Sequence, residues 1–237
     1  MKVIAIPIAF NEEKKIGHVI ARIREARCVD EILLVDDGST DDTARVAEAE
    51  GAKVLHRGQR GGAGAALRSG FAYSLEHGFD ITVILAGNNK DEPKENPRLL
   101  DPIRNDEADF VQGSRYLPGG GYGDMPFYRQ LATRYVHPLM FSCIARQRFT
   151  DTTNGFRAIR RAILEDSRID LSQPWLDQYE LEPYLMYKAV RLGYRVIEAP
   201  VTKIYPPKQL GYTKMKPITG WWSILRPLLY LALGIKK

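Results

Sequence analysis

Apolar residues follow two alternating patterns along the chain. Short unbroken apolar runs are typical of buried β-strands, and each is followed by a segment with apolar residues three or four positions apart, the spacing of an amphipathic helix. Strands alternating with helices in this way predict an α/β fold with a mostly parallel sheet and right-handed crossovers. The expected strands cover 3–7 (ended by Pro7), 32–35, 52–56, 81–85, 108–113 and 194–201, and the expected helices cover 16–23, 40–50, 65–77 and 180–192.

The apolar run 32–35 leads directly into two carboxylates, Asp36 and Asp37. A glycine then permits a tight turn, and Ser39 and Thr40 are expected to cap the N-terminus of the next helix. In open α/β sheets, loops at the carboxyl ends of the strands carry the ligand. An acidic loop at this place suits a nucleoside base, a ribose hydroxyl or a cation. The alternative is that the two carboxylates only form the turn.

A glycine-rich segment follows the third expected strand. Gly62 and Gly64 are similar to part of a dinucleotide-binding fingerprint, but a lone glycine pattern is weak, and here it follows the third strand instead of the first. These glycines are better explained by a backbone that passes close to a nucleotide or to a neighbouring loop. Arg60 and Arg68 flank them, and each either faces a diphosphate or is a solvated surface charge.

Composition restricts the partners and surroundings of the chain. It has 237 residues and a formal net charge of +5, which permits an anionic membrane surface or a phosphorylated substrate. Without zinc-finger spacing or an RNA-binding aromatic motif, nucleic acid is not an expected partner. Cys28 and Cys143 match no metal spacing and are expected to be buried thiols in a reducing compartment. The N-terminus shows no signal-peptide pattern, so we expect a cytoplasmic location, with any membrane contact at the inner face.

The C-terminal stretch 221–235 is the most apolar part of the chain. Two tryptophans begin it and two lysines follow it, a pattern typical of a helix lying in the membrane interface. The stretch falls short of the ~20 residues needed to span a bilayer. The alternative is a helix that packs on the rest of the domain. We therefore expect a catalytic domain over 1–216 and an apolar helix over 217–237.

Three segments resemble, in order and spacing, the family 2 glycosyltransferases, and among these the dolichyl- or polyprenyl-phosphate sugar synthases. They are IPIAFNEE (6–13), VDDGSTDDT (35–43) and GAGAALRSG (62–70). The resemblance implies a nucleotide-diphospho-sugar transferase fold, known as GT-A, and a UDP- or GDP-linked sugar as donor. The residues that it implies for the nucleotide site are Pro7, Ala9, Asn11, Glu13, Asp36, Asp37, Gly62 and Arg68, with Asp36 at the base or ribose.

The segment after the fourth strand departs from the family pattern. Family members carry Asp-x-Asp there, which holds a divalent metal on the donor diphosphate, whereas this chain has Ala86 and Asn88. Asn88 and Asp91 would make a weaker site for Mg²⁺ or Mn²⁺, because hard cations prefer carboxylate oxygens. Alternatively, Lys90 neutralises the leaving diphosphate directly as a point charge. The same substitutions would also suit an inactive relative.

The second half of the chain supplies candidate phosphate ligands. Arg115 follows the fifth strand, and Arg129 comes fourteen residues later in an expected helix. The resemblance implies that this pair grips an acceptor phosphate, which suits the bidentate guanidinium fork. Lys208 and Lys214 match a basic family loop that is expected to close over a phosphate. The apolar side of the helix that carries Arg129 is expected to include Leu131, Leu139, Met140 and Ile144.

Asp151 begins a segment that is similar to the family's Asp-x-x-x-Gly-Phe-Arg motif. A carboxylate there would act as general base for a hydroxyl acceptor. A phosphate acceptor is already ionised, and Asp151 would then hold sugar hydroxyls or a metal. The alternative is a turn cap. Glu180 and Glu182 are candidates to face the sugar.

These observations predict an inverting hexosyltransferase whose preferred acceptor is a polyprenyl phosphate. Asp151, Arg115, Arg129 and Lys90 would act at the reacting groups. A transferase to a saccharide or small hydroxyl compound, with Asp151 as base, is the first alternative. A non-catalytic nucleotide-sugar-binding protein is the second.

Overall fold

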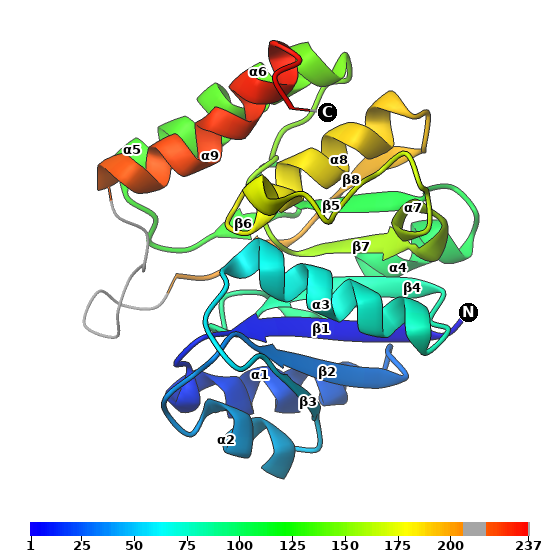
Figure 1. The fold of residues 1–237 in the computed structure, drawn as a ribbon, viewed down its shortest axis with the longest axis vertical. Coiled ribbons are helices and arrows are strands. Elements are labelled where there is room, and N and C mark those ends of the chain that lie inside the picture. The colour runs from blue at the N-terminus through cyan, green and yellow to red at the C-terminus, as the bar shows by residue number, and fades with distance from the viewer. Residues whose placement is uncertain (206–216, 237) are drawn as a thin grey trace.

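The computed structural model describes residues 1–205 and 217–236. Its centre is a seven-stranded sheet in the order β3-β2-β1-β4-β7-β5-β8, in which only β7 runs antiparallel to its neighbours (Figure 1). The prediction of a mostly parallel sheet is therefore confirmed. The strands are β1 (Val3–Ala9), β2 (Glu31–Asp36), β3 (Lys53–His56), β4 (Ile81–Ala86), β5 (Phe110–Ser114), β7 (Arg157–Arg160) and β8 (Val196–Pro200). A second, two-stranded parallel sheet joins β6 (Gly121–Tyr122) to β9 (Thr202–Lys203).

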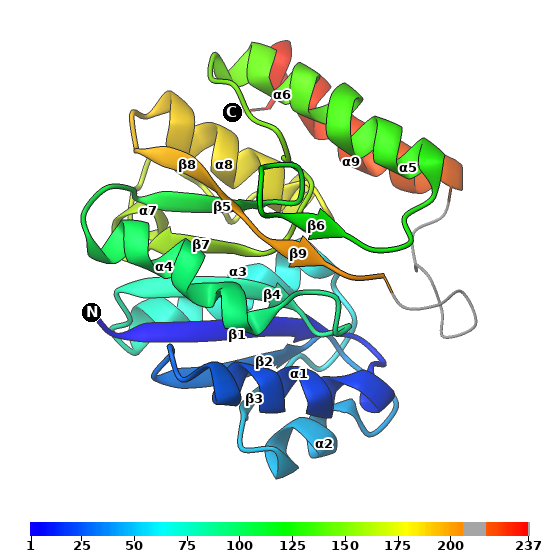
Figure 2. The ribbon, with the colours of Figure 1, turned by 180° about the vertical axis from the view of Figure 1, so that it is seen from behind.

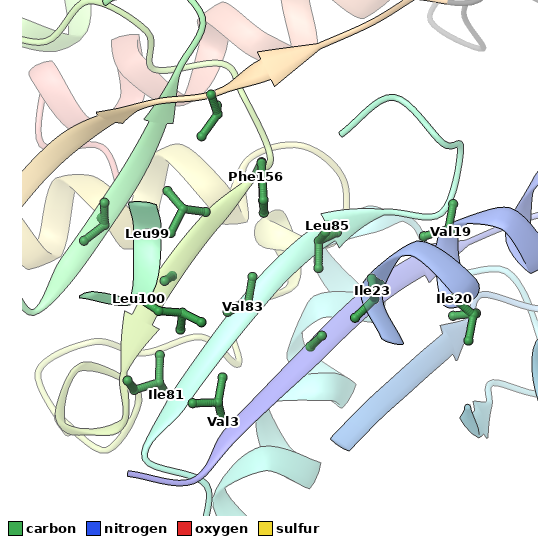
Figure 3. Packing of buried hydrophobic residues seen from close by; sticks show 14 of the residues in the cluster. Val3, Val19, Ile20, Ile23, Ile81, Val83, Leu85, Leu99, Leu100 and Phe156 are labelled. Atoms are coloured by element: carbon green, nitrogen blue, oxygen red, sulfur yellow. The ribbon is translucent and has the colours of Figure 1, made fainter. Parts of the chain in front are cut away.

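Helices cover both faces of the sheet. One face is covered by α1 (Glu13–Ala26), α2 (Thr43–Ala49) and α4 (Asn96–Arg104), and the other by α3 (Ala63–Glu76), α7 (Arg161–Leu164) and α8 (Leu181–Arg191) (Figures 1 and 2). Between the sheet and the first layer, Val19, Ile20 and Ile23 of α1 pack toward strand residues such as Val83, as Figure 3 shows. The helical spacing of these apolar residues correctly predicted the buried side of α1.

An outer pair of helices lies beyond α8. The first begins as α5 (Phe127–Leu131), passes through the π-helical turn η2 (Ala132–Val136) and continues as α6 (His137–Ala145). The second is α9 (Pro217–Ala232), which lies beside α6 (Figure 2) and buries Leu228 and Leu231. Within the described residues, none of the helices has both the length and the apolar character needed to cross a membrane.

Two local predictions about strand and helix ends were wrong. Pro7 does not end the first strand, because β1 continues to Ala9 and stays paired with β4. Its pairing with β2 is interrupted at Ile6 and Pro7, where the proline offers no N–H. Ser39 and Thr40 do not cap α2, which begins at Thr43.

Two expectations about side-chain burial were also wrong, the second only in part. Both cysteines are unpaired, as expected, but Cys143 is exposed and Cys28 is only half-buried. Of the four residues expected on the apolar side of their helix, Leu131 and Leu139 are exposed to solvent, whereas Met140 and Ile144 are half-buried and pack against the core. The fully buried positions of this helix include His137, Phe141 and Ala145.

Candidate active site

Two adjoining cavities open at the carboxyl ends of the parallel strands. The larger, of about 280 Å³, and the smaller, of about 140 Å³, share Ile8, Ala63, Asn88 and Tyr179 in their walls. They lie where the chain order of the strands reverses, between β1 and β4, which is the usual ligand-binding position in an open α/β sheet. The loops selected from the sequence therefore meet around one hollow.

The acidic loop is shaped by its own two carboxylates. Asp37 accepts hydrogen bonds from the backbone N–H groups of Gly61 and Gly62, at 2.9 and 2.8 Å, and lines the smaller cavity. Asp36 accepts a hydrogen bond from the N–H of Ser39 at 3.0 Å and lines neither cavity. Both are buried. Asp36 thus fits the alternative of a turn former, whereas Asp37 holds the glycine loop at the edge of the smaller cavity.

Of the four residues expected from the first loop, Ala9 lines a cavity, and neighbours that were not expected line it as well. Ala9 and Gly62 line the smaller cavity, together with Phe10, Glu12 and Arg60. The Arg60 guanidinium lies over the Phe10 ring, 4.1 Å from its centroid, so a cation and an aromatic face stand together at this wall. The structure places the side chains of Pro7, Asn11 and Glu13 outside both cavity walls.

The glycine-rich segment passes close to a neighbouring loop. The N–H of Gly64 donates to the carbonyl of Gln178 at 2.7 Å, and a Cβ at Gly64 would lie 1.9 Å from the carbonyl oxygen of Leu176. Close passage past a neighbouring loop, one of the two explanations from the sequence, is therefore observed. Arg68 is ion-paired with Asp177 in that loop and lines neither cavity.

The loop after β4 is held by β9. Lys203 Nζ lies 2.5 Å from Asp91 Oδ1 and 3.2 Å from Asn154 Oδ1, and the N–H of Ile204 donates to the carbonyl of Lys90 at 2.8 Å. The other oxygen of Asp91 accepts a hydrogen bond from the N–H of Ala86 at 2.9 Å. Both oxygens of Asp91 are therefore engaged. Lys203, which motif comparison did not select, lines the larger cavity.

The donor set at this loop does not fit the divalent site expected from the family pattern. Ala86 has no ligand atom, and the carboxylate of Asp91 is paired with Lys203. The remaining candidate is Asn88, which lines both cavities and whose buried Oδ1 has no hydrogen-bond partner among the described residues. Across residues 1–205 and 217–236, no three His, Cys, Asp or Glu side chains gather as metal ligands. One neutral oxygen is a poor substitute for a carboxylate pair.

Lys90 is buried close to other cations. Its ammonium lies 4.8 Å from the ring centroid of Tyr205, which lines the larger cavity. Burial, followed by repulsion from Lys203 and Arg129, lowers the pKa of Lys90 to about 8. A lysine in such a position gains most from an anion, because the anion offsets both the lost hydration and the repulsion.

Arg115 and Asp151, predicted to act on different groups, form one buried ion pair. Nε and Nη2 of Arg115 lie 2.6 and 2.8 Å from the two oxygens of Asp151. Asp151 is fully buried, and the adjacent guanidinium holds its pKa below the usual range despite burial. Arg115 also donates to Thr153 and Tyr205 while lining the larger cavity.

The outer helix 127–145 forms one wall of the larger cavity. Arg129, Thr133 and His137, spaced four residues apart, line it together with Ile224 of α9. The Arg129 guanidinium lies 5.4 Å from the ring centroid of Tyr205.

Other predicted residues fall into three groups. Glu182 lines the larger cavity and is ion-paired with Arg157 at 3.0 Å. Glu180, by contrast, is fully buried and paired with Arg226 of α9. Lys208 and Lys214 lie outside the described residues.

Comparisons with known proteins agree with this arrangement. A family model described as glycosyl transferase family 2 matches residues 4–168. The undecaprenyl-phosphate mannosyltransferase of Micrococcus luteus is 33% identical over 91% of this chain and 88% of its own length. The polyprenol monophosphomannose synthase of Mycolicibacterium smegmatis is 32% identical over 87% of this chain and 78% of its own length.

Solved structures show the same fold. Glucosyl-3-phosphoglycerate synthase from Mycobacterium tuberculosis, in complex with Mn²⁺, UDP-glucose and phosphoglyceric acid, is 25% identical with a TM-score of 0.69. The match covers 100% of this chain and 81% of that one. The expected GT-A fold is thereby confirmed, as is the assignment to enzymes that transfer sugars. This chain belongs to glycosyl transferase family 2.

Proposed function

We propose that this protein transfers a sugar from a nucleotide diphosphate to a polyprenyl phosphate in one inverting displacement. The observation that carries the proposal is the pair of adjoining cavities, one walled by the nucleotide-type loops and the other by cationic side chains. The relatives from Micrococcus luteus and Mycolicibacterium smegmatis, whose names specify a polyprenyl carrier and mannose, support this acceptor class.

The smaller cavity suits the nucleoside of the donor. Ala9 and Gly62 let a planar base approach the backbone, and the Phe10 ring under Arg60 offers an apolar surface beside a cation. Because the two cavities share Asn88 and Tyr179, a diphosphate that leaves the nucleoside pocket would enter the larger cavity at that boundary.

We infer that lysines replace the divalent ion at the donor diphosphate. A divalent ion held by two carboxylates brings no net charge to a site. The pair of Lys203 and Asp91 is likewise neutral, and Lys90 adds one positive charge beside it. Preorganised cations of this kind stabilise negative charge as it develops on the leaving diphosphate. Asn88 Oδ1 remains available to accept a hydrogen bond from a donor hydroxyl.

The acceptor phosphate would enter beside Arg129 in the larger cavity. One of its oxygens attacks the anomeric carbon while the bond to the nucleotide diphosphate breaks on the opposite side, so the configuration inverts. Holding both phosphates in line supplies proximity. A phosphate nucleophile needs no general base, which agrees with an Asp151 that is buried and bound to Arg115. The hydroxyl-acceptor alternative, which requires Asp151 as base, is not favoured.

The role of Lys90 predicts a pH dependence of donor affinity. Below a pH of about 8 the ammonium of Lys90 is charged and attracts the diphosphate, and above it the charge is lost. The Kd for a nucleotide sugar, measured by calorimetry, should therefore rise about tenfold between pH 7 and 9.5, since one close charge–charge interaction contributes about 1–2 kcal/mol. Lys90→Arg should remove the dependence, because arginine stays charged throughout. An unchanged profile in this variant would contradict the assignment.

A transfer assay tests the proposed function directly. UDP- and GDP-linked sugars are screened for thermal stabilisation, and the best donor is incubated with an undecaprenyl phosphate in detergent. Formation of a glycosyl lipid phosphate with inverted anomeric configuration supports the proposal. Donor binding without transfer to any polyprenyl phosphate would reject it, and transfer to a saccharide in its place would identify the hydroxyl-acceptor alternative.

A further inference from the structure

The helical segment 127–145 carries a row of exposed apolar side chains. Phe127 and Leu139 are 78% and 67% exposed, and the exposed residues between them recur at helical spacing. We call this row the outer face; it consists of Phe127, Tyr128, Leu131, Tyr135, Val136 and Leu139. A single exposed apolar residue is normal, but a contiguous row on one helix marks an interaction surface.

Helix α9 also leaves apolar side chains exposed. It lies beside α6 in both views of the ribbon, with Leu228 and Leu231 buried against the domain (Figures 1 and 2). Trp222 and Leu229 of this helix, by contrast, are exposed, and so is Leu233 directly after its end, by 71%. The two neighbouring helices therefore both leave large apolar side chains uncovered.

The helix that carries the outer face also lines the larger cavity. Arg129, Thr133 and His137 face the cavity, and each is two residues beyond Phe127, Leu131 and Tyr135. Thr133 and His137 are buried, whereas Leu131, Tyr135 and Leu139 are exposed, so the cavity-lining residues and the outer face lie on different sides of this segment. One helix thus separates the proposed phosphate site from whatever covers the outer face.

Charge along the sequence identifies the partner of this surface. Segments 125–150 and 203–237, which contain the two outer helices, have eleven lysines and arginines and no aspartate or glutamate. Because the whole chain has a net charge of +5, the other residues together carry −6. Among the described residues of the first segment, Arg134, Arg146 and Arg148 are exposed. Exposed cations on the segment that carries an apolar row suit an anionic lipid surface. A second copy of the chain would instead bring like charges together.

We propose that the outer face docks on an anionic lipid bilayer, with Phe127, Leu131 and Leu139 in the boundary between headgroups and acyl chains. Tyr128 and Tyr135 are amphipathic and suit the headgroup level. Exposed Arg134 and Arg148 would contact lipid phosphates. This orientation places the larger cavity one helix away from the bilayer surface. That this orientation serves to deliver a lipid acceptor to the cavity rests on the proposed function, whereas the docking on the bilayer does not.

Vesicle binding by the full chain tests this inference. The protein is sedimented with vesicles of phosphatidylcholine alone or with 30% phosphatidylglycerol, over a range of salt concentrations. We expect binding to the anionic vesicles that weakens at least fivefold as salt is raised, because salt screens the attraction between the arginines and the anionic lipids. Phe127→Ser/Leu139→Ser should weaken binding at least tenfold. Arg134→Gln should weaken it about fivefold on anionic vesicles only.

Ile197→Ser is the matched control, because Ile197 is an exposed apolar residue of β8 outside the outer face. It should leave vesicle binding within twofold of the wild type. Thermal melts show whether each variant is folded. Equal binding by the wild type and by Phe127→Ser/Leu139→Ser would overturn the proposal. So would a concentration-dependent dimer that this double variant abolishes, with no vesicle binding by the wild type.

The outcomes separate docking from catalysis. Transfer to a polyprenyl phosphate in detergent without vesicle binding would reject the docking surface and leave the proposed function intact. Vesicle binding without transfer would reject the proposed function and support the surface.

Discussion

Replacing Lys203 by methionine should lower kcat for sugar transfer by about 10²–10³-fold, the usual loss when one preorganised stabiliser of developing charge is removed. Lys203 lines the larger cavity and is fixed by Asp91 at 2.5 Å and by Asn154 at 3.2 Å. It is therefore in position before the diphosphate departs. Because the ground-state diphosphate carries less charge on the bridging oxygen than the leaving group does, kcat should fall more than donor affinity. Steady-state kinetics and donor calorimetry measure the two effects.

The methionine variant also leaves Asp91 buried without its cation, so stability must be followed in parallel. Lys203→Arg keeps the charge and should retain most of the activity if the variant melts normally. Lys94→Met, at an exposed lysine three residues after Asp91, should change kcat less than twofold. Wild-type enzyme in excess EDTA should keep its activity. A reversible loss that Mn²⁺ restores would show that a divalent ion, and not Lys203, serves the diphosphate.

The sequence was sufficient to predict six of the seven strands of the sheet and the edge at which the site lies, but it did not predict the antiparallel strand β7. Unbroken apolar runs gave β1, β2 and β4, and each is followed by a loop that reaches the cavities. Parallel strands bring their carboxyl ends to one edge, so Ala9, Asp37 and Asn88 had to lie near one another. Such predictions depend on local periodicity and on topology, and both can be recognised from short segments of the sequence.

Interactions between distant segments could not be predicted in the same way. Lys203 lies 112 residues after Asp91, and neither belongs to a motif that names the other as its partner. Arg115 and Asp151 were both selected from motifs, but the sequence does not show that they neutralise each other. A motif identifies a charged residue. The function of that residue depends on which opposite charges the fold places beside it.

Periodicity also did not show which side of the helix 127–145 is buried. Leu131 and Leu139 have the spacing of a core stripe, yet they are exposed. Phe141 and Ala145 are buried on another side, together with His137, whose polarity made it a poor candidate for the core. An apolar stripe on a helix suits both packing against a protein core and contact with a lipid surface. The pattern alone therefore does not show which of the two the stripe contacts.

Asp151→Asn should lower the free energy of unfolding by about 3–5 kcal/mol, because it leaves the buried guanidinium of Arg115 without a counter-charge. Asp151 is fully buried and Arg115 is 3% exposed, so water cannot replace the lost partner. Urea denaturation at pH 7 measures the change through the transition midpoint. Since the pKa of Asp151 is depressed in the folded state, its contribution is present above its unfolded pKa and is lost as pH falls further. The variant should therefore be least different from wild type in acid.

Arg115→Met/Asp151→Leu is the informative control, because removing both charges leaves no buried ion uncompensated. This double variant should recover much of the stability lost by Asp151→Asn, since buried ion pairs are often replaceable by apolar residues of similar size. An Asp151→Asn protein as stable as wild type would contradict the paired geometry. The same argument bears on acceptor chemistry: a loss of transfer in Asp151→Asn follows from the disturbed wall of the larger cavity for any acceptor. Loss of activity in this variant is therefore no evidence for a general base, and only the acceptor supplied to the wild-type enzyme separates a phosphate from a hydroxyl nucleophile.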